Sequence, residues 1–282
     1  MLSGSCLCGE VTYQVAEPID HFTHCHCSMC RKIHGTPFGT YFRSPQVTFT
    51  SGRDNIAMYE SSPGFFRCFC NQCGSVAPEE SQEADYHFVP AGGIDGDITE
   101  RPSQHIFVES KADWYQITDE LPQADCYSMD SAGAGVEQAD RSNAQTGHVA
   151  GSCLCGKVTF KYTEGADKLM MLCHCSRCRK VKGAAHAYNL FVAPQDFHWL
   201  TGADNVTVYD LPNADRFGNS FCRDCGSSVP RKSANSPMFN ISVGTLDDTP
   251  DIDPKAHIFV GSKSNWFEIT GSILQCEEMP QD

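Results

Sequence analysis

The sequence predicts a mainly β protein that consists of two zinc-binding domains in tandem. Three observations predict this fold class. The chain repeats itself once, its apolar residues alternate with polar ones in short runs, and 17 of its 282 residues are cysteines, most of them in closely spaced groups. Apolar residues make up 40% of the chain and aromatic residues 10%, which is enough to form packed cores.

The internal repeat consists of four segments that recur in the same order. Residues 4–13 recur as 151–160, 25–32 as 173–180, 69–75 as 221–227, and 105–108 as 257–260. Each copy therefore reads as one complete unit of about 120 residues, and we expect two domains, at 1–122 and 148–282. Residues 123–147 are rich in Ala, Ser, Gly, Gln and Asp, which is typical of a flexible linker.

The short apolar runs have the period of strands. Val11, Tyr13 and Val15 alternate with polar residues, and Val158, Phe160 and Tyr162 do the same in the second copy. Further strands are expected at 38–42, 47–50, 56–59, 106–108, 114–117 and 206–209. Only the residues after Cys30 and Cys178 are suited to a helical turn, so each domain is expected to be mainly antiparallel β.

Two pairs of cysteines in each copy predict a closed structural zinc site. Zinc prefers four thiolate or imidazole ligands in a tetrahedron, and a close pair on a tight turn can present two sulfurs to one ion. The expected ligands are Cys6, Cys8, Cys70 and Cys73 in the first domain, and Cys153, Cys155, Cys222 and Cys225 in the second. A glycine follows each pair, as expected where the backbone must turn with positive φ. The alternative is that these thiols form disulfides or are merely buried.

A cysteine triple in each copy predicts a second, catalytic zinc site. The triples are Cys25, Cys27 and Cys30 in the first domain, and Cys173, Cys175 and Cys178 in the second. Three thiolates leave one of the four positions around zinc free for a thiolate or water, which is the arrangement of catalytic zinc. The alternative makes His26 or His174 the fourth ligand and closes the site, but a residue between two ligands can rarely turn to the same ion.

Basic residues follow each triple directly and are candidates for substrate binding. Arg31 and Lys32, with Arg179 and Lys180 in the second copy, could receive a substrate carboxylate, although a solvated turn explains them equally well. His105, Lys111 and Trp114, repeated as His257, Lys263 and Trp266, could line a pocket, but core packing is the better expectation for the tryptophans.

The charge balance argues against a nucleic-acid partner. The chain has 21 basic and 35 acidic residues, a net charge of −14, whereas phosphate backbones require a basic surface. No run approaches the roughly 20 apolar residues of a membrane span, and no export signal is visible, so we expect a cytoplasmic protein without a membrane partner. In a reducing compartment, dense cysteine indicates metal binding, and a small molecule or a protein is the expected partner.

The ordered motifs resemble the glutathione-dependent formaldehyde-activating enzyme family. Both copies carry G-x-C-x-C-G, C-H-C-S-x-C-R-K, F-C-x-x-C-G-S and H-I-F-V-x-S-K-x-x-W. The resemblance implies a β-tent fold, a structural zinc on the outer cysteine pairs and a catalytic zinc on each triple, hence two zinc ions per domain. It also implies a carbon–sulfur lyase that joins glutathione and formaldehyde into S-hydroxymethylglutathione. The first copy departs from the family pattern at Gly93, where the second copy has the usual threonine, Thr245.

Two hypotheses about function follow from these features. The first is an enzyme that adds a small thiol, glutathione or a similar one, to formaldehyde or another small aldehyde at the open three-cysteine site. The second is a non-catalytic, zinc-stabilised module that binds a thiol or a protein, with the tandem arrangement giving avidity. In either case the two domains could pack together within the chain.

Overall fold

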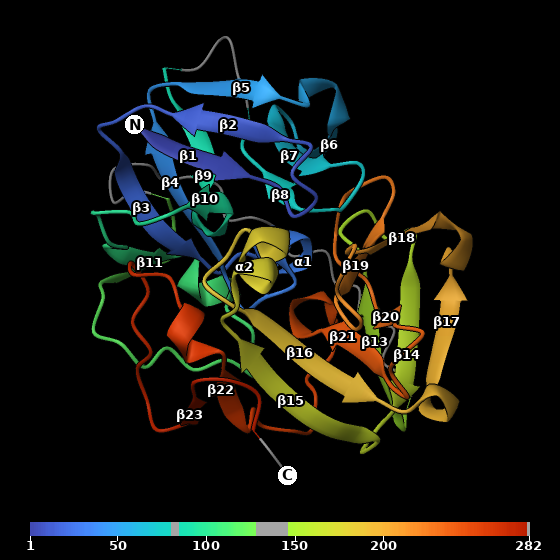
Figure 1. Ribbon diagram of the computed structural model, residues 1–282. Coiled ribbons are helices and arrows are strands. Elements are labelled where there is room, and N and C mark those ends of the chain that lie inside the picture. The colour runs from blue at the N-terminus through green and yellow to red at the C-terminus, as the bar shows by residue number, and fades with distance from the viewer. Residues whose placement is uncertain (80–84, 128–145, 281–282) are drawn as a thin grey trace.

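The computed structural model describes residues 1–79, 85–127 and 146–280, which form two similar, mainly β halves. We call residues 1–127 the first half and residues 146–280 the second half. The fold class expected from the sequence is confirmed. The first half occupies the top of Figure 1 and most of the second half the bottom, with the two helices between them.

The first half contains twelve strands and one helix among its described residues. They are β1 (Leu2–Ser5), β2 (Thr12–Val15), β3 (Asp20–Cys25), α1 (Ser28–His34), β4 (Gly39–Ser44), β5 (Val47–Ser51), β6 (Ile56–Ser62), β7 (Phe65–Cys70), β8 (Val76–Ala77), β9 (His87–Pro90), β10 (Ile94–Asp95), β11 (Gln104–Ile106) and β12 (Gln123–Ala124).

The second half follows the same order with eleven strands among its described residues, because it has no strand equivalent to β10. Its elements are β13 (His148–Ser152), β14 (Thr159–Thr163), β15 (Asp167–Cys173), α2 (Ser176–Lys182), β16 (Ala187–Val192), β17 (Phe197–Thr201), β18 (Val206–Asp210), β19 (Gly218–Cys222), β20 (Arg231–Lys232), β21 (Phe239–Ser242), β22 (Ala256–Ile258) and β23 (Leu274–Cys276).

Three sheets make up each half among the described residues. In the first half their strand orders are β10-β1-β2-β5, β12-β11-β3-β4-β9 and β6-β7-β8. In the second half they are β13-β14-β17, β20-β21-β16-β15-β22-β23 and β18-β19. The first cysteine of each triple, Cys25 or Cys173, is the last residue of β3 or β15. Both strands are interior to the largest sheet of their half, so each triple begins at the end of a strand that is paired on both sides.

The alternating pattern at the start of each copy forms the expected strands. In β2, Tyr13 and Val15 are buried while Gln14 is exposed, and in β14 Phe160 and Tyr162 are fully buried. The prediction of a strand at 114–117 is wrong, because these residues form a turn and irregular chain. Their apolar side chains instead pack on the other half, as shown below.

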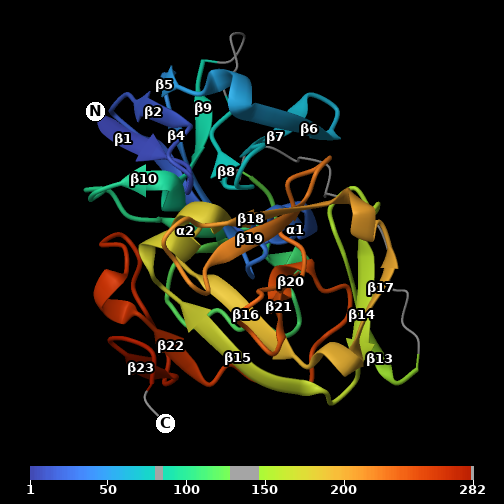
Figure 2. The same ribbon diagram turned by 45° about the vertical axis from the view of Figure 1, so that its right-hand side comes forward.

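The two cysteine-bearing helices meet at the interface between the halves. α1 and α2 lie side by side in both views (Figures 1 and 2). Each also packs against a tight turn of the opposite half: a Cβ atom at Gly92 would lie 2.6 Å from the carbonyl oxygen of Arg179, and one at Gly244 would lie 2.5 Å from that of Arg31. Only glycine permits this approach, so the helices are held in place by both halves.

A lysine from each helix crosses the interface. Lys32 Nζ donates to the carbonyl oxygens of Ser152 (3.0 Å) and Thr245 (2.8 Å) and lies 2.5 Å from Asp247 Oδ1. Lys180 makes the corresponding contacts with Ser5 and Asp95 of the first half. The Lys32 pair is the more buried of the two, with side-chain exposures of 10% and 6% against 21% and 42%.

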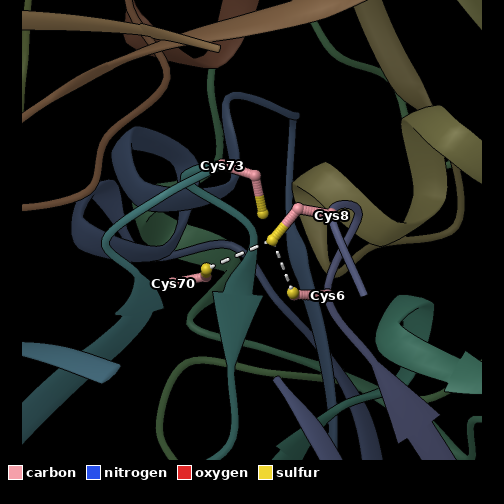
Figure 3. Close-up of side chains that lie close together, drawn as sticks. All are labelled: Cys6, Cys8, Cys70 and Cys73. Carbon is pink, nitrogen blue, oxygen red and sulfur yellow. Dashed lines mark hydrogen bonds between the residues drawn. The ribbon is translucent and has the colours of Figure 1, made fainter. Parts of the chain in front are cut away.

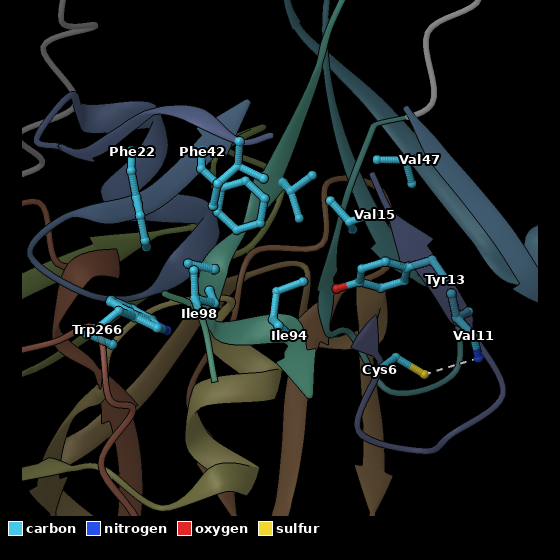
Figure 4. Packing of buried hydrophobic residues seen from close by; sticks show 14 of the residues in the cluster. Cys6, Val11, Tyr13, Val15, Phe22, Phe42, Val47, Ile94, Ile98 and Trp266 are labelled. Atoms are coloured by element: carbon cyan, nitrogen blue, oxygen red, sulfur yellow. Dashed lines mark hydrogen bonds between the residues drawn. The ribbon is translucent and has the colours of Figure 1, made fainter. Parts of the chain in front are cut away.

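The halves also exchange aromatic side chains. Trp266, from the second half, is 3% exposed and packs in the core of the first half, where its ring centroid lies 5.5 Å from that of Phe22 (Figure 4). Trp114, from the first half, packs on the core of the second half, 5.7 Å from Tyr188. Core packing is thus confirmed for Trp266, which lies in the core of the other half, whereas Trp114 is half-buried on the surface of the other core.

The first residues of the expected linker form a short strand. Gln123 and Ala124 form β12, which pairs in parallel with β11, and Tyr127 packs near the first cysteine triple. The domains expected at 1–122 and 148–282 stay a prediction. Residues 128–145 of the expected linker lie outside the described residues.

Within the described ranges, neither helix is long and apolar enough to span a membrane.

Candidate functional site

Four sulfur atoms converge in each half where the sequence predicts a closed metal site. Cys6, Cys8, Cys70 and Cys73 lie within 4.8 Å of one another, and so do Cys153, Cys155, Cys222 and Cys225. Figure 3 shows the first group, presented by the turn after β1 and the turn after β7. All the described cysteines are free thiols, which excludes the disulfide alternative in this structure.

The sulfur spacings fit a tetrahedral metal ion. A zinc–sulfur bond of about 2.3 Å implies sulfur atoms about 3.8 Å apart. The separations of Cys8 from Cys70 and of Cys155 from Cys222 are 3.8 and 3.7 Å, and the Cys6–Cys8 and Cys153–Cys155 pairs are 3.2 and 3.4 Å apart. The donor set therefore fits zinc, and the φ angles of the four glycines that follow the pairs lie between 70° and 79°, as expected.

Backbone and side-chain donors stabilise the negative charge on these sulfurs. The amide of Val11 donates to Cys6 Sγ and that of Val158 to Cys153 Sγ, each at 3.3 Å. Asn205 donates to Cys222 Sγ at 3.4 Å. Such bonds favour the thiolate, which is the form that binds metal.

The triples form open clusters at the starts of the two helices. The sulfurs of Cys25, Cys27 and Cys30 lie within 4.8 Å of one another, as do those of Cys173, Cys175 and Cys178. Cys27 and Cys175 are the N-caps of α1 and α2, and their sulfurs accept from the amides of Cys30 (3.4 Å) and Cys178 (3.5 Å). Among the described residues, neither cluster includes a fourth metal-binding side chain, so each leaves one position of a tetrahedral ion free.

The middle cysteine of each triple is the strongest acid. Hydrogen bonds from the neighbouring thiols, chiefly Cys173, lower the pKa of Cys175 to about 3. Contacts with Cys25 and Cys30 likewise place the pKa of Cys27 well below its usual range. Each cluster thus has a thiolate at the helix N-cap, poised to bind a cation.

The histidines between the cysteines face away from the sulfurs. His26 directly follows the end of β3, and its ring does not belong to the sulfur cluster of Cys25, Cys27 and Cys30. Its Nε2 lies 2.8 Å from Nδ1 of His105, whose other nitrogen lies 3.0 Å from Asp119. His174 pairs with His257 in the same way at 2.8 Å. Burial lowers the pKa of both His26 and His174 to about 3, so they are neutral neighbours of the clusters and not their fourth ligands.

A large cavity opens beside the first triple. It has a volume of about 620 Å³, and Cys25, Cys27 and Cys30 all line it. Arg67 of β7 also lines it, with Nη1 3.7 Å from Cys30 Sγ and Nε 3.2 Å from Ser61 Oγ. Burial alone would lower the pKa of Arg67, but its electrostatic interactions with the sulfur cluster, chiefly with Cys30, raise it, so the guanidinium is a permanent positive charge beside the cluster.

A tyrosine–histidine pair forms part of the cavity wall. Tyr41 lines the cavity, and its hydroxyl lies 2.7 Å from His34 Nε2. Nδ1 of His34 contacts the carbonyl oxygen of Lys182, which can only accept, so we assign the proton to Nδ1. Tyr41 therefore donates its own proton to Nε2, and its oxygen can act only as an acceptor, with Arg67 as a neighbouring donor.

The four basic residues that follow the triples lie elsewhere. Lys32 and Lys180 cross to the opposite half, as described above. Arg31 donates to the carbonyl oxygen of Ser110 at 3.4 Å, and Arg179 to that of His174 at 3.3 Å. None of the four lines the cavity, and neither do His105, Lys111 and Trp114. A role for these residues in substrate binding stays a prediction.

The departure from the family pattern at Gly93 has a local explanation. A Cβ atom at Gly93 would lie 2.5 Å from the hydroxyl of Tyr13, which is buried. In the second half the corresponding residues are Thr245 and Phe160, which has no hydroxyl. The Tyr13 hydroxyl thus fills the space of the missing threonine side chain, and Gly93 does not line the cavity.

Arg67, Tyr41 and His34 were not foreseen as site residues. None of them belongs to a recurring motif, since the second half has Asn219, Asn189 and Lys182 at these positions. A difference between the copies could have pointed to Arg67. It lies three residues before the metal-site cysteine Cys70, and the second copy has no arginine at the equivalent position, Asn219.

Comparison with known proteins identifies both halves. The family model described as glutathione-dependent formaldehyde-activating enzyme matches residues 1–110 and 148–262. A Halomonas elongata protein, provisionally named as such an enzyme, is 33% identical over 132 residues, which are 42% of this chain and 81% of that protein. An uncharacterized lyase of Schizosaccharomyces pombe is 32% identical over 73 residues, which are 26% of this chain and 53% of that protein.

A crystal structure of a Rhodobacter sphaeroides protein is 26% identical, covering 36% of this chain and 91% of that chain with a TM-score of 0.28. The two family matches coincide with the two copies found in the sequence, and each contains one closed cluster and one cysteine triple. The chain therefore belongs to the glutathione-dependent formaldehyde-activating enzyme family, with two family units in one polypeptide.

Proposed function

We propose that this protein is a zinc-dependent carbon–sulfur lyase that joins a small thiol, glutathione or a similar one, to formaldehyde or another small aldehyde. The observation that carries the proposal is the three-sulfur cluster of Cys25, Cys27 and Cys30, which opens into a cavity of about 620 Å³ beside a fixed arginine. The eight cysteines of the closed clusters would hold structural zinc, one ion in each half.

The reaction is an addition whose atoms balance without a further reagent. The sulfur of the thiol forms a bond to the carbonyl carbon, the π electrons of the carbonyl move to its oxygen, and the thiol proton ends on that oxygen. Zinc held by the triple would keep the incoming thiol deprotonated at neutral pH. The reverse reaction breaks the same carbon–sulfur bond.

The residues of the first half can assist each part of this addition. The guanidinium of Arg67 stabilises negative charge on the incoming sulfur or on the carbonyl oxygen. The oxygen of Tyr41, oriented by its bond to His34, can accept a hydrogen bond from the thiol proton or from the product hydroxyl. The cavity wall holds the two reactants next to each other and away from bulk water.

The test compares matched variants of the two triples. Exchange spectroscopy by NMR measures how much the zinc-loaded protein accelerates the interconversion of glutathione, formaldehyde and their adduct above the uncatalysed rate. We expect Cys27→Ala to remove most of the acceleration, with Cys175→Ala as the matched variant that measures the share of the second half. An unchanged rate in the protein carrying both substitutions would refute the proposal. Saturable thiol binding without acceleration would instead support a non-catalytic binding module.

A further inference from the structure

The cavity of the first half is much larger and more apolar than formaldehyde requires. Its volume of about 620 Å³ lies within the range of pockets that enclose drug-sized ligands. Aromatic side chains dominate its wall, among them Phe65, Phe66, Tyr86, Phe88 and Phe107. Such a wall favours a ligand with a bulky apolar body.

Aromatic residues at the cavity rim are exposed although they are apolar. Phe65 and Phe66 follow the hairpin turn between β6 and β7, and their side chains are 56% and 38% exposed. Tyr86, at the start of the segment leading to β9, is 37% exposed. Phe107 also lines the cavity but is half-buried against the cysteine triple. Phe65, Phe66 and Tyr86 belong to none of the core clusters of the described residues, so their exposed rings are available to a ligand.

The cavity offers a single cation to an anionic group. Among its described lining residues, Arg67 is the one cation and Glu79 the one carboxylate. Arg67 approaches Cys30 Sγ at 3.7 Å, so an anionic group bound to Arg67 would lie close to the sulfur cluster. Glutathione carries two carboxylates and one ammonium group, more charge than this wall can pair, and unpaired charges are costly to bury.

The second half lacks this arrangement. Asn219 replaces Arg67 and turns to the other half, where its Nδ2 donates to the carbonyl oxygen of Cys73 at 3.0 Å. Gly218 stands in the place of Phe66. The second triple therefore has neither the cation nor this rim aromatic at the corresponding positions.

We propose that the cavity of the first half selects a thiol that carries a bulky apolar body and a single carboxylate. Arg67 receives the carboxylate, the aromatic wall encloses the apolar body, and the thiol sulfur reaches the open position of the Cys25–Cys27–Cys30 cluster. The inference rests on the proposed function in taking a thiol as the substrate. Only the triple of the first half is expected to select this class of thiol, so each chain has one selective site.

Isothermal titration calorimetry on the zinc-loaded full chain tests this inference with three probes. They are 2-mercapto-3-phenylpropanoate, mercaptoacetate and glutathione. We expect one tight site per chain and an affinity for the phenyl-bearing probe at least about 10-fold higher than for either of the others, since burial of a phenyl ring is worth a factor of this order or more. Equal or tighter binding of glutathione, or two equivalent sites per chain, would overturn the inference.

Two variants locate the bound probe. Arg67→Asn, which introduces the residue of the second half, should weaken binding of the phenyl-bearing probe and of mercaptoacetate by about 10-fold or more. Phe66→Ser should reduce the preference for the phenyl ring and leave mercaptoacetate binding unchanged. Leu200→Ser is the control, because Leu200 is 42% exposed on β17 of the second half and does not line the cavity. If Arg67→Asn does not fold, Arg67→Lys and the probe series on the unmodified chain still decide the question.

The outcomes separate this inference from the proposed function. Accelerated exchange of glutathione and formaldehyde without a preference for the phenyl-bearing thiol would support the proposed function and reject the inference. A phenyl preference that depends on Phe66 and Arg67, without acceleration of any thiol addition, would support the cavity assignment and reject the enzymatic proposal.

Discussion

The exchange of tryptophans between the halves makes a quantitative prediction about stability. Trp266 belongs to the second half by sequence, yet its side chain is 3% exposed in the same core cluster as Cys6, Cys70 and Cys73 of the first half. An indole buries roughly 200 Å² of surface, worth up to about 5 kcal/mol at 25 cal/mol per Å². Trp266→Ala should therefore lower the free energy of unfolding by about 3–5 kcal/mol, as other large-to-small core substitutions do.

The assay is urea unfolding followed by far-UV circular dichroism, with zinc release recorded by a chromogenic chelator. In Trp266→Ala, zinc should be released at lower urea concentration first from the closed site of the first half, although the substituted residue lies in the second. Trp114→Ala is the matched variant and should affect the second half first, because Trp114 packs on its core. A loss of less than about 1 kcal/mol in Trp266→Ala, or early zinc release confined to the second half, would refute the exchanged packing.

Three further predictions concern the interface between the halves and the core of the first half. Lys32→Met leaves Asp247 buried without its lysine partner and should lower the free energy of unfolding by about 3 kcal/mol. Lys180→Met removes the more exposed ion pair and should lower it by about 1 kcal/mol or less. Equal losses in urea unfolding would contradict the assigned burial of the two pairs. Gly93→Thr should destabilise the protein, because a Cβ at Gly93 would meet the Tyr13 hydroxyl at 2.5 Å. Adding Tyr13→Phe to this variant should restore its stability. A double-mutant cycle without coupling would show that the two side chains do not share this space. Burial lowers the pKa of His186 well below its usual range, so its contribution to stability is complete above the unfolded pKa of about 6.5 and is lost as the pH falls below that value. His186→Phe introduces the residue found at the equivalent Phe38, and it should raise the free energy of unfolding at pH 8 by about 1 kcal/mol, since Nδ1 of His186 is buried without a partner. The same variant should lose less stability between pH 6.5 and 5. An unchanged dependence of the unfolding free energy on pH would contradict this prediction.

The metal clusters could be predicted from the sequence because their ligands come in short, repeated spacings. Two sulfurs separated by one or two residues can reach one ion only through a tight turn, and the recurrence of the same pairs in both copies indicated which pairs belong together. The structure brings all fourteen of these cysteines into the expected groups. The alternating residues around Tyr13 and Phe160 predicted strands for a similarly local reason.

The interface and the cavity could not be predicted in the same way. Lys32 and Trp266 could satisfy the sequence pattern equally well within their own half, and only the packed structure shows that their partners lie in the other one. Residues 114–117 have an apolar pattern typical of a strand, but they pack across the interface and form no ladder. Arg67 lies outside the recurring motifs, so nothing in its own segment pointed to Cys30.

The zinc content of the purified chain, loaded with excess zinc and then freed of unbound metal, tests the central claim most directly. Two closed clusters and two open triples predict close to four zinc ions per chain by elemental analysis. The protein with Cys27→Ala and Cys175→Ala together should retain close to two and remain folded, since both closed clusters are intact. Close to two ions in the unmodified protein, or no loss of zinc in the double variant, would contradict metal binding by the triples.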